Sequence, residues 1–123
     1  MTTAPIARIS TAAFAMRERI PVWREMFGRT IARLDFEPLS TGPFAAQATL
    51  RTLPGMGLVS MTSRDLRFRK PPDLIDNDDL VLAIVETGCW EGSQLGREVH
   101  LRAGEAVLCT NAEIAVGIAC AAG

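Results

Sequence analysis

Histidine is almost absent from this chain: His100 is the single one in 123 residues. Catalytic iron, manganese or zinc is usually held by several neutral imidazoles together with a carboxylate. One imidazole cannot complete such a site, so the sequence predicts no metal and no other cofactor. A glycine-rich phosphate loop, a Gly-x-Ser-x-Gly turn and an HExxH motif are missing as well. We therefore expect no catalytic residues and no enzyme activity.

An excess of charge of either sign is also lacking, because 13 basic and 14 acidic side chains leave a net charge of −1. Near neutrality removes the attraction that supplies most non-specific affinity for nucleic acids, so we expect no DNA binding by this chain alone. The three cysteines, Cys89, Cys109 and Cys120, form no CxxC pair. Neither a signal peptide nor an apolar run of membrane-spanning length is visible. These features predict free thiols, a cytoplasmic location and no membrane contact.

A length of 123 residues suits one domain. Residues 1–9 are expected to be a flexible arm, followed by a folded domain over residues 10–123. Ser10 or Thr11 could cap a short helix over residues 12–19, and Pro21 suits the first position of a second helix that ends near Ile31. Six side chains of this segment share one mainly apolar face, which should lie on a hydrophobic surface: Trp23, Met26, Phe27, Thr30, Ile31 and Leu34.

After Asp35 the pattern changes to short strands separated by Gly and Pro. Eight strands are predicted, over residues 34–39, 44–53, 57–62, 66–69, 80–87, 98–101, 106–110 and 114–120. Many short strands without helices between them predict an antiparallel sandwich or barrel. The unbroken apolar run at 80–85 favours a central strand covered on both sides. The acidic stretch at 70–79 favours a solvated loop, because its spacing departs from that of a calcium loop.

A glycine-marked turn over residues 96–111 resembles the second motif of the cupins. Gly96, Gly104 and Asn111 stand at the motif's glycine and asparagine positions, whereas Arg102 and Val107 replace its proline and its metal-binding histidine. The resemblance therefore concerns the geometry of the turn and not the metal chemistry.

The sequence also resembles the AraC-type ligand-binding domain. The resemblance is carried by the Trp23-Arg24-Glu25 helix, a strand led by Phe44, and the pattern Gln94, Gly96, Arg97 and Gly104. It implies a mainly β fold, a cupin-like double-stranded β-helix or jelly-roll barrel, with one or two amino-terminal helices. It further implies the sensing and dimerising half of a transcriptional regulator, which binds a small-molecule effector and reaches DNA only through a carboxyl-terminal helix-turn-helix domain absent from this chain.

Four side chains are the predicted ligand contacts, chosen for their chemistry and expected place at the barrel mouth: Arg67, Arg69, Trp90 and His100. Trp90 would stack on a flat ligand, and Arg67 would pair with a carboxylate. In the alternative interpretation Arg67 and Arg69 face solvent and Trp90 fills the core. Cys89, beside Trp90, is either a reactive thiol or a buried inert one.

Two other functional classes stay open at this point. One is a small stand-alone cupin, either a metal-free binding protein or a metal-dependent enzyme. The other is an interaction module whose barrel is filled by side chains. The apolar run at 114–122 has no later sequence to cover it, which predicts self-association, with a homodimer as the expected state.

Overall fold

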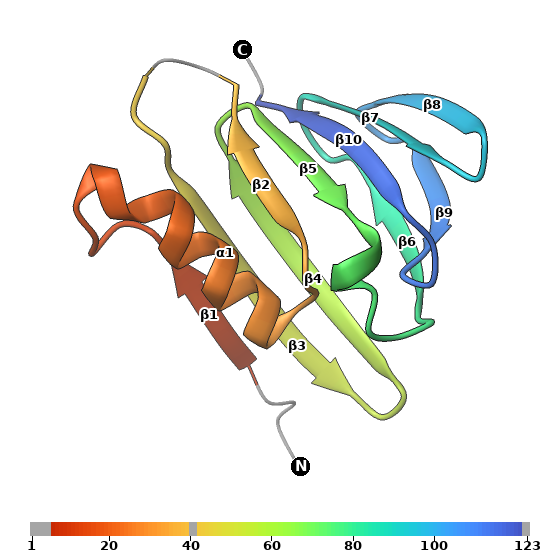
Figure 1. The fold of residues 1–123 in the computed structure, drawn as a ribbon, viewed down its shortest axis with the longest axis horizontal. Coiled ribbons are helices and arrows are strands. Elements are labelled where there is room, and N and C mark those ends of the chain that lie inside the picture. Colours follow the sequence, from red (N-terminus) through yellow and green to blue (C-terminus); the bar gives the residue numbers. More distant parts are fainter. Residues whose placement is uncertain (1–5, 40–41, 122–123) are drawn as a thin grey trace.

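Ten antiparallel strands and one α-helix make up the computed structural model, which describes residues 6–39 and 42–121 (Figure 1). The strands are β1 (Ile6–Ser10), β2 (Asp35–Pro38), β3 (Ala46–Leu53), β4 (Met56–Ser63), β5 (Leu66–Lys70), β6 (Leu80–Ile84), β7 (Cys89–Gln94), β8 (Arg97–Arg102), β9 (Ala106–Thr110) and β10 (Ala115–Cys120). The helix α1 spans Arg19–Thr30, and single 3-10 turns occupy Met16–Glu18 and Pro72–Leu74.

The strands form three sheets, ordered β1-β3-β4, β2-β5-β10-β7-β8 and β6-β9. In Figure 1 the five-stranded sheet lies in front of the three-stranded sheet, and α1 lies beside β2, over β1 and β3. The predicted class is therefore confirmed: the fold is mainly β and cupin-like, a β-sandwich with an amino-terminal helix.

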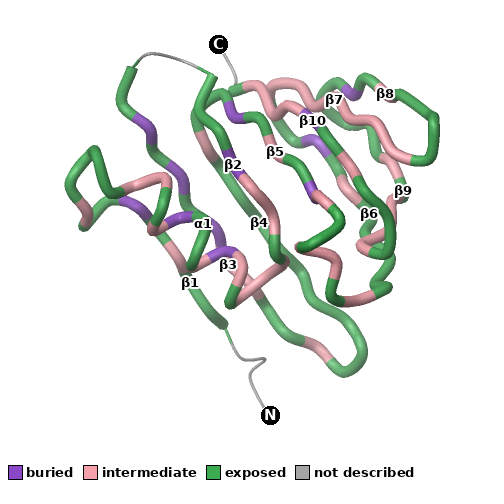
Figure 2. Tube along the Cα trace, in the orientation of Figure 1, coloured by how far each residue is buried: buried purple, intermediate pink, exposed green. Residues whose placement is uncertain are grey.

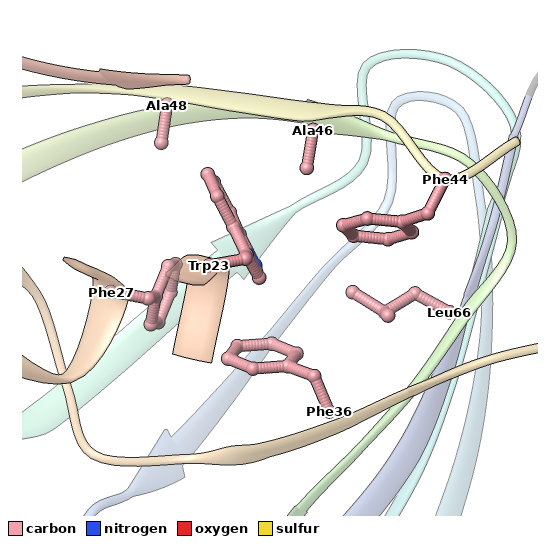
Figure 3. Packing of buried hydrophobic residues seen from close by; sticks show 7 residues of the cluster. All are labelled: Trp23, Phe27, Phe36, Phe44, Ala46, Ala48 and Leu66. Atoms are coloured by element: carbon pink, nitrogen blue, oxygen red, sulfur yellow. The ribbon is translucent and has the colours of Figure 1, made fainter. Parts of the chain in front are cut away.

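The hydrophobic core lies between α1, β3 and the β2–β5 edge of the larger sheet (Figure 3). Trp23 and Phe27 of α1 are buried, and the Phe27 ring meets Phe36 edge-on at 5.1 Å. Met26, Ile31 and Leu34 pack around this cluster, so the predicted apolar face of the helix is confirmed. Buried residues accordingly gather around α1, β2 and β3, while β4 and β6 are mostly exposed (Figure 2).

The prediction for the segment before α1 was wrong. Residues 12–18 form a turn and one 3-10 turn, and α1 begins at Arg19, two residues before Pro21. Thr11 does not cap a helix because its hydroxyl is bound to β3: it accepts a hydrogen bond from the Ala46 N–H at 3.1 Å. The Arg19 guanidinium, which donates to the carbonyls of Phe14 and Phe44, stabilises the turn from the other side.

The amino-terminal arm is also ordered further than expected. Residues 6–10 form β1, which pairs with β3 from Ile6 opposite Arg51 to Ser10 opposite Gln47. The expected boundary at residues 9 and 10 thus falls inside a strand; residues 1–5 lie outside the described part of the chain. The strand was missed because its sequence, IARIS, has weak alternation and gains its stability from the ladder with β3.

The structure reverses the positions expected for two apolar runs, at 80–85 and 114–122. The run at 80–84 is not a central strand: β6 pairs with β9, and Leu80, Leu82 and Ile84 are 72%, 62% and 62% exposed. The central strand is β10, which pairs with β5 on one side and β7 on the other. Both edges of the apolar strand β10 are thus paired with strands of the same chain. The expectation of an unpaired apolar edge there was wrong.

The expectation of three free thiols was wrong for two of them. Cys89 and Cys120 lie opposite each other on β7 and β10, with Cα atoms 4.9 Å apart, and form a disulfide. They are 31 residues apart in sequence, so only the strand pairing brings them together. Cys109 is a thiol on β9, and burial raises its pKa.

Candidate functional site

The five-stranded sheet has two chemically different faces, which follow from its register. Directly paired residues of antiparallel strands point to the same side. One row across the sheet reads Phe36, Phe68, Gly117, Gly92 and Val99, and the next reads Asp35, Arg69, Val116, Ser93 and Glu98. Phe36 belongs to the core, so the first row marks the inner face and the second row marks a charged outer face.

A shallow groove of about 190 Å³ lies on the outer face, across β5, β10, β7 and β8. Arg67 and His100 both line it, so two of the four predicted ligand contacts come together there. Each has an acidic neighbour: Arg67 lies 3.5 Å from Glu37, and the His100 Nδ1 lies 2.9 Å from the Glu91 carboxylate. These side chains satisfy one another and do not converge on one point.

Arg69 lies on the same face but outside the groove. Its guanidinium is 3.3 Å from Asp35, which also pairs with Arg24 of α1 at 2.8 Å. The side chains of Arg67 and Arg69 are 45% and 59% exposed, so for them the alternative of solvent-facing arginines holds. Ion pairs this exposed contribute little affinity or stability, since water and salt screen them.

Trp90 points to the opposite, inner face. Its ring stacks on Phe68 with centroids 5.5 Å apart and planes 27° apart. Two glycines leave room for these rings: a Cβ on Gly92 would lie 2.6 Å from the Trp90 ring, and one on Gly117 would lie 2.3 Å from the Phe68 ring. Trp90 is half-buried, so it contributes to the core and still offers an aromatic surface on the inner face. A single small ligand cannot contact Trp90 and Arg67 together, because the sheet separates them.

The inner side of the opposite sheet is incompletely covered at β4. Met61 pairs with Ala48, which is 3% exposed, and therefore points toward the core side. Even so, Met61 and its inner-face neighbour Val59 are 37% and 44% exposed. Apolar side chains of both sheets are thus accessible on the inner side, a surface typical of binding sites for small organic molecules.

A second hollow, of about 250 Å³, lies where the end of α1 meets the loop after β5, between Arg24, Gly28, Arg33 and Leu74. Behind Leu74, Lys70 is 2% exposed and its ammonium donates a 3.4 Å hydrogen bond to the Leu74 carbonyl. Burial lowers the pKa of Lys70, Asp76 opposes this effect, and Arg33 adds to it. Lys70 shares the inner face of β5 with Leu66 and Phe68, because the three residues occupy alternate positions of the strand. This alternation could have revealed the inward lysine from the sequence, but the sequence analysis missed it.

Gly96, Gly104 and Asn111 lie in connections between strands. Gly96 closes the β7–β8 hairpin with φ of 73°, after Leu95 at 55°, and Gly104 lies between β8 and β9 with φ of 90°. Both conformations favour glycine. Asn111 follows β9, and its N–H donates to the Asp79 carbonyl at 2.9 Å. This hydrogen bond joins the end of β9 to the start of β6. These residues therefore shape the connections between strands.

Within residues 6–39 and 42–121, no group of three or more His, Cys, Asp or Glu side chains is arranged to hold a metal ion. In the same residues, no helix has the length and apolar character needed to cross a membrane.

Comparison with known proteins decides the family. Residues 23–116 match the model of the AraC-binding-like domain. The chain belongs to this family. The crystal structure of the AraC-like transcriptional activator CuxR has the same fold, with a TM-score of 0.79 and 12% sequence identity over 96% of this chain. This AraC-binding-like domain corresponds to 44% of the CuxR chain, and no curated protein sequence matches it.

Proposed function

We propose that this AraC-binding-like domain is the effector-sensing and dimerising part of an AraC-family transcriptional regulator that acts in the cytoplasm. It controls transcription through a helix-turn-helix domain outside this chain, and it performs no catalysis. The observation that carries the proposal is the family match over residues 23–116. The cupin-like sandwich with accessible apolar side chains on its inner side supports it.

The effector site is on the inner face, around Trp90. Small-molecule sites are mostly apolar, with a few polar groups, and the half-buried Trp90–Phe68 stack supplies a flat aromatic surface on the inner face. The outer groove, with exposed and mutually paired charges, suits a ligand less well. A flat and largely apolar effector follows from this choice. Binding changes transcription only if the effector has different affinities for two arrangements of the regulator.

The test is a thermal-shift screen of small flat molecules, with indole as a neutral probe and benzoate as an anionic one. A ligand that binds only the folded state stabilises it by about 2.7 kcal/mol at 100 times its Kd. We expect Trp90→Ala to abolish the shift and His100→Ala, on the outer face, to retain it. The opposite result would move the site to the outer groove, and a panel without any stabilising compound would contradict the sensing role.

An interaction module with a filled interior is the second candidate function. The mutual stacking of Trp90 and Phe68 favours it, because each ring already occupies the other's face. In that case Trp90→Ala lowers the free energy of unfolding and leaves every ligand response unchanged.

A further inference from the structure

The outer side of the β6–β9 ribbon exposes a row of large apolar side chains. Leu82 and Leu108 are directly paired and each is 62% exposed, with Leu80 at 72% and Ile84 at 62% on the same side of β6. Val81 and Ala83 lie on the other side of β6, and Val85, directly after the strand, is 8% exposed. We call the four side chains Leu80, Leu82, Ile84 and Leu108 the β6–β9 face.

No charged side chain lies within this face. Thr110 and Ala106, which pair with Leu80 and Ile84, complete it without adding one. The outer side of the five-stranded sheet, by contrast, alternates acids and bases such as Asp35, Arg69 and Glu98. Solvent-exposed sheets normally carry charges that discourage association, so an uncharged apolar face marks a contact surface.

The charges around the face narrow the class of partner. Four exposed carboxylates lie beside the two strands, together with one exposed arginine, Arg102, whose backbone N–H donates to the Glu105 carboxylate; the acids are Asp78, Asp79, Glu86 and Glu105. An acidic border repels nucleic acids and anionic membranes. Once nucleic acids and anionic membranes are excluded, the partner expected for this face is an apolar protein surface. A second copy of this domain supplies such a surface.

The size of the face fits a weak pair of copies. Four side chains at these exposures present roughly 400 to 500 Å², at the upper end of the largest patch on a typical monomer. Two copies packed face to face bury roughly 900 Å² in total, near the lower limit for a specific interface. Such a pair would be reversible and would form at high protein concentration.

We propose that two copies of this domain pack through their β6–β9 faces around a twofold axis, with the Leu82–Leu108 pair of each copy at the centre. The proposal rests on the dimerising part of the proposed function and assigns a surface to it. A twofold contact requires a self-complementary patch, and a stripe of leucines meets that need. The acidic borders of the two copies then lie close together, so salt strengthens this dimer by screening their repulsion.

Sedimentation equilibrium of the 123-residue chain at 0.05 and 0.5 M NaCl tests the proposal. We expect a monomer–dimer equilibrium that tightens severalfold at the higher salt. Leu82→Glu places a carboxylate at the centre and should weaken dimerisation at least tenfold. The control is Leu95→Glu, which adds the same charge at a leucine 67% exposed in the β7–β8 turn, outside the face, and should leave the dimer unchanged.

Each other outcome has a definite meaning. A monomer at every concentration and salt removes both this surface and the dimerising role, while effector binding is judged separately with Trp90→Ala. A dimer that Leu82→Glu leaves intact overturns the β6–β9 assignment and keeps dimerisation through another surface. Circular dichroism checks folding, and if Leu82→Glu is unfolded, Leu80→Ser at the most exposed position of the face replaces it, with the same expected direction.

Discussion

Replacement of Gly117 by alanine should destabilise the domain through a clash at the centre of the larger sheet. The new Cβ would lie 2.3 Å from the Phe68 ring and 2.6 Å from the Glu91 carbonyl oxygen, both far inside van der Waals contact. The ring can rotate away, but the carbonyl belongs to the neighbouring strand β7 and moves only if the ladder moves. The strain therefore falls on the β10–β7 pairing and on the Phe68–Trp90 stack together.

The expected net loss is about 1.3 kcal/mol in the free energy of unfolding. Overpacking of a well-packed site costs roughly 1 to 3 kcal/mol. Loss of glycine's freedom in the unfolded chain returns roughly 0.4 to 1 kcal/mol. Gly92→Ala should cost less, because its Cβ meets only ring atoms of Trp90, the nearest at 2.6 Å, and a ring can move.

Urea unfolding followed by circular dichroism measures these differences, with Gly42→Ala as the matched control, since no atom lies within 4 Å of a Cβ at Gly42. We expect the order of destabilisation Gly117→Ala, Gly92→Ala, Gly42→Ala, and a midpoint for Gly117→Ala roughly 1 M lower in urea. Tryptophan fluorescence should change in both strand variants because the Trp90 stack is disturbed. Equal stability of Gly117→Ala and Gly42→Ala would refute the packing argument.

Three further predictions concern other parts of the domain. Reduction of the Cys89–Cys120 disulfide, or Cys89→Ser, should lower the free energy of unfolding by about 3 to 4 kcal/mol for a loop of this length. Urea unfolding with and without dithiothreitol measures the difference. Equal midpoints would show that the disulfide does not constrain the unfolded chain. Lys70→Met should be neutral or stabilising by up to about 1 kcal/mol at pH 7. The pKa of Lys70 is lower in the folded state than in the unfolded chain, so the stability of the wild-type protein rises with pH between those two pKa values. The stability advantage of Lys70→Met should therefore shrink toward pH 10. A stability difference that stays constant with pH would contradict the burial of the charge. Finally, elemental analysis of untagged protein should find no stoichiometric iron, manganese or zinc, whereas about one ion per chain would favour the enzyme interpretation.

The disulfide bears on the cellular location that we propose for this domain. Structural disulfides are rare in a reducing cytoplasm, where we propose that this domain acts. The reduced form, with Cys89 and Cys120 as thiols opposite each other on paired strands, is then the form to compare with the oxidised one in each stability experiment. A domain stable only when oxidised would argue against a cytoplasmic location.

Several features could be predicted from the sequence because they depend on local patterns. The apolar face of α1, with Trp23 and Phe27, follows from a period of 3.6 residues, and most strands follow from β-branched runs between glycines and prolines. The turns at Gly96 and Gly104 follow from the need for positive φ. The family resemblance that the sequence suggested is confirmed by the family match over residues 23–116.

The tertiary structure decided everything that depends on which strands are neighbours. The runs at 80–84 and 114–120 are equally apolar, and only the pairing made β10 central and left β6 on a two-stranded ribbon. Pairing also brought Cys89 to Cys120 across 31 residues, and register placed Trp90 and His100 on opposite faces of one sheet. The physical reason is that period-two alternation tells which residues share a face of a strand, but the direction of that face is set by long-range hydrogen bonds and burial that local sequence does not contain.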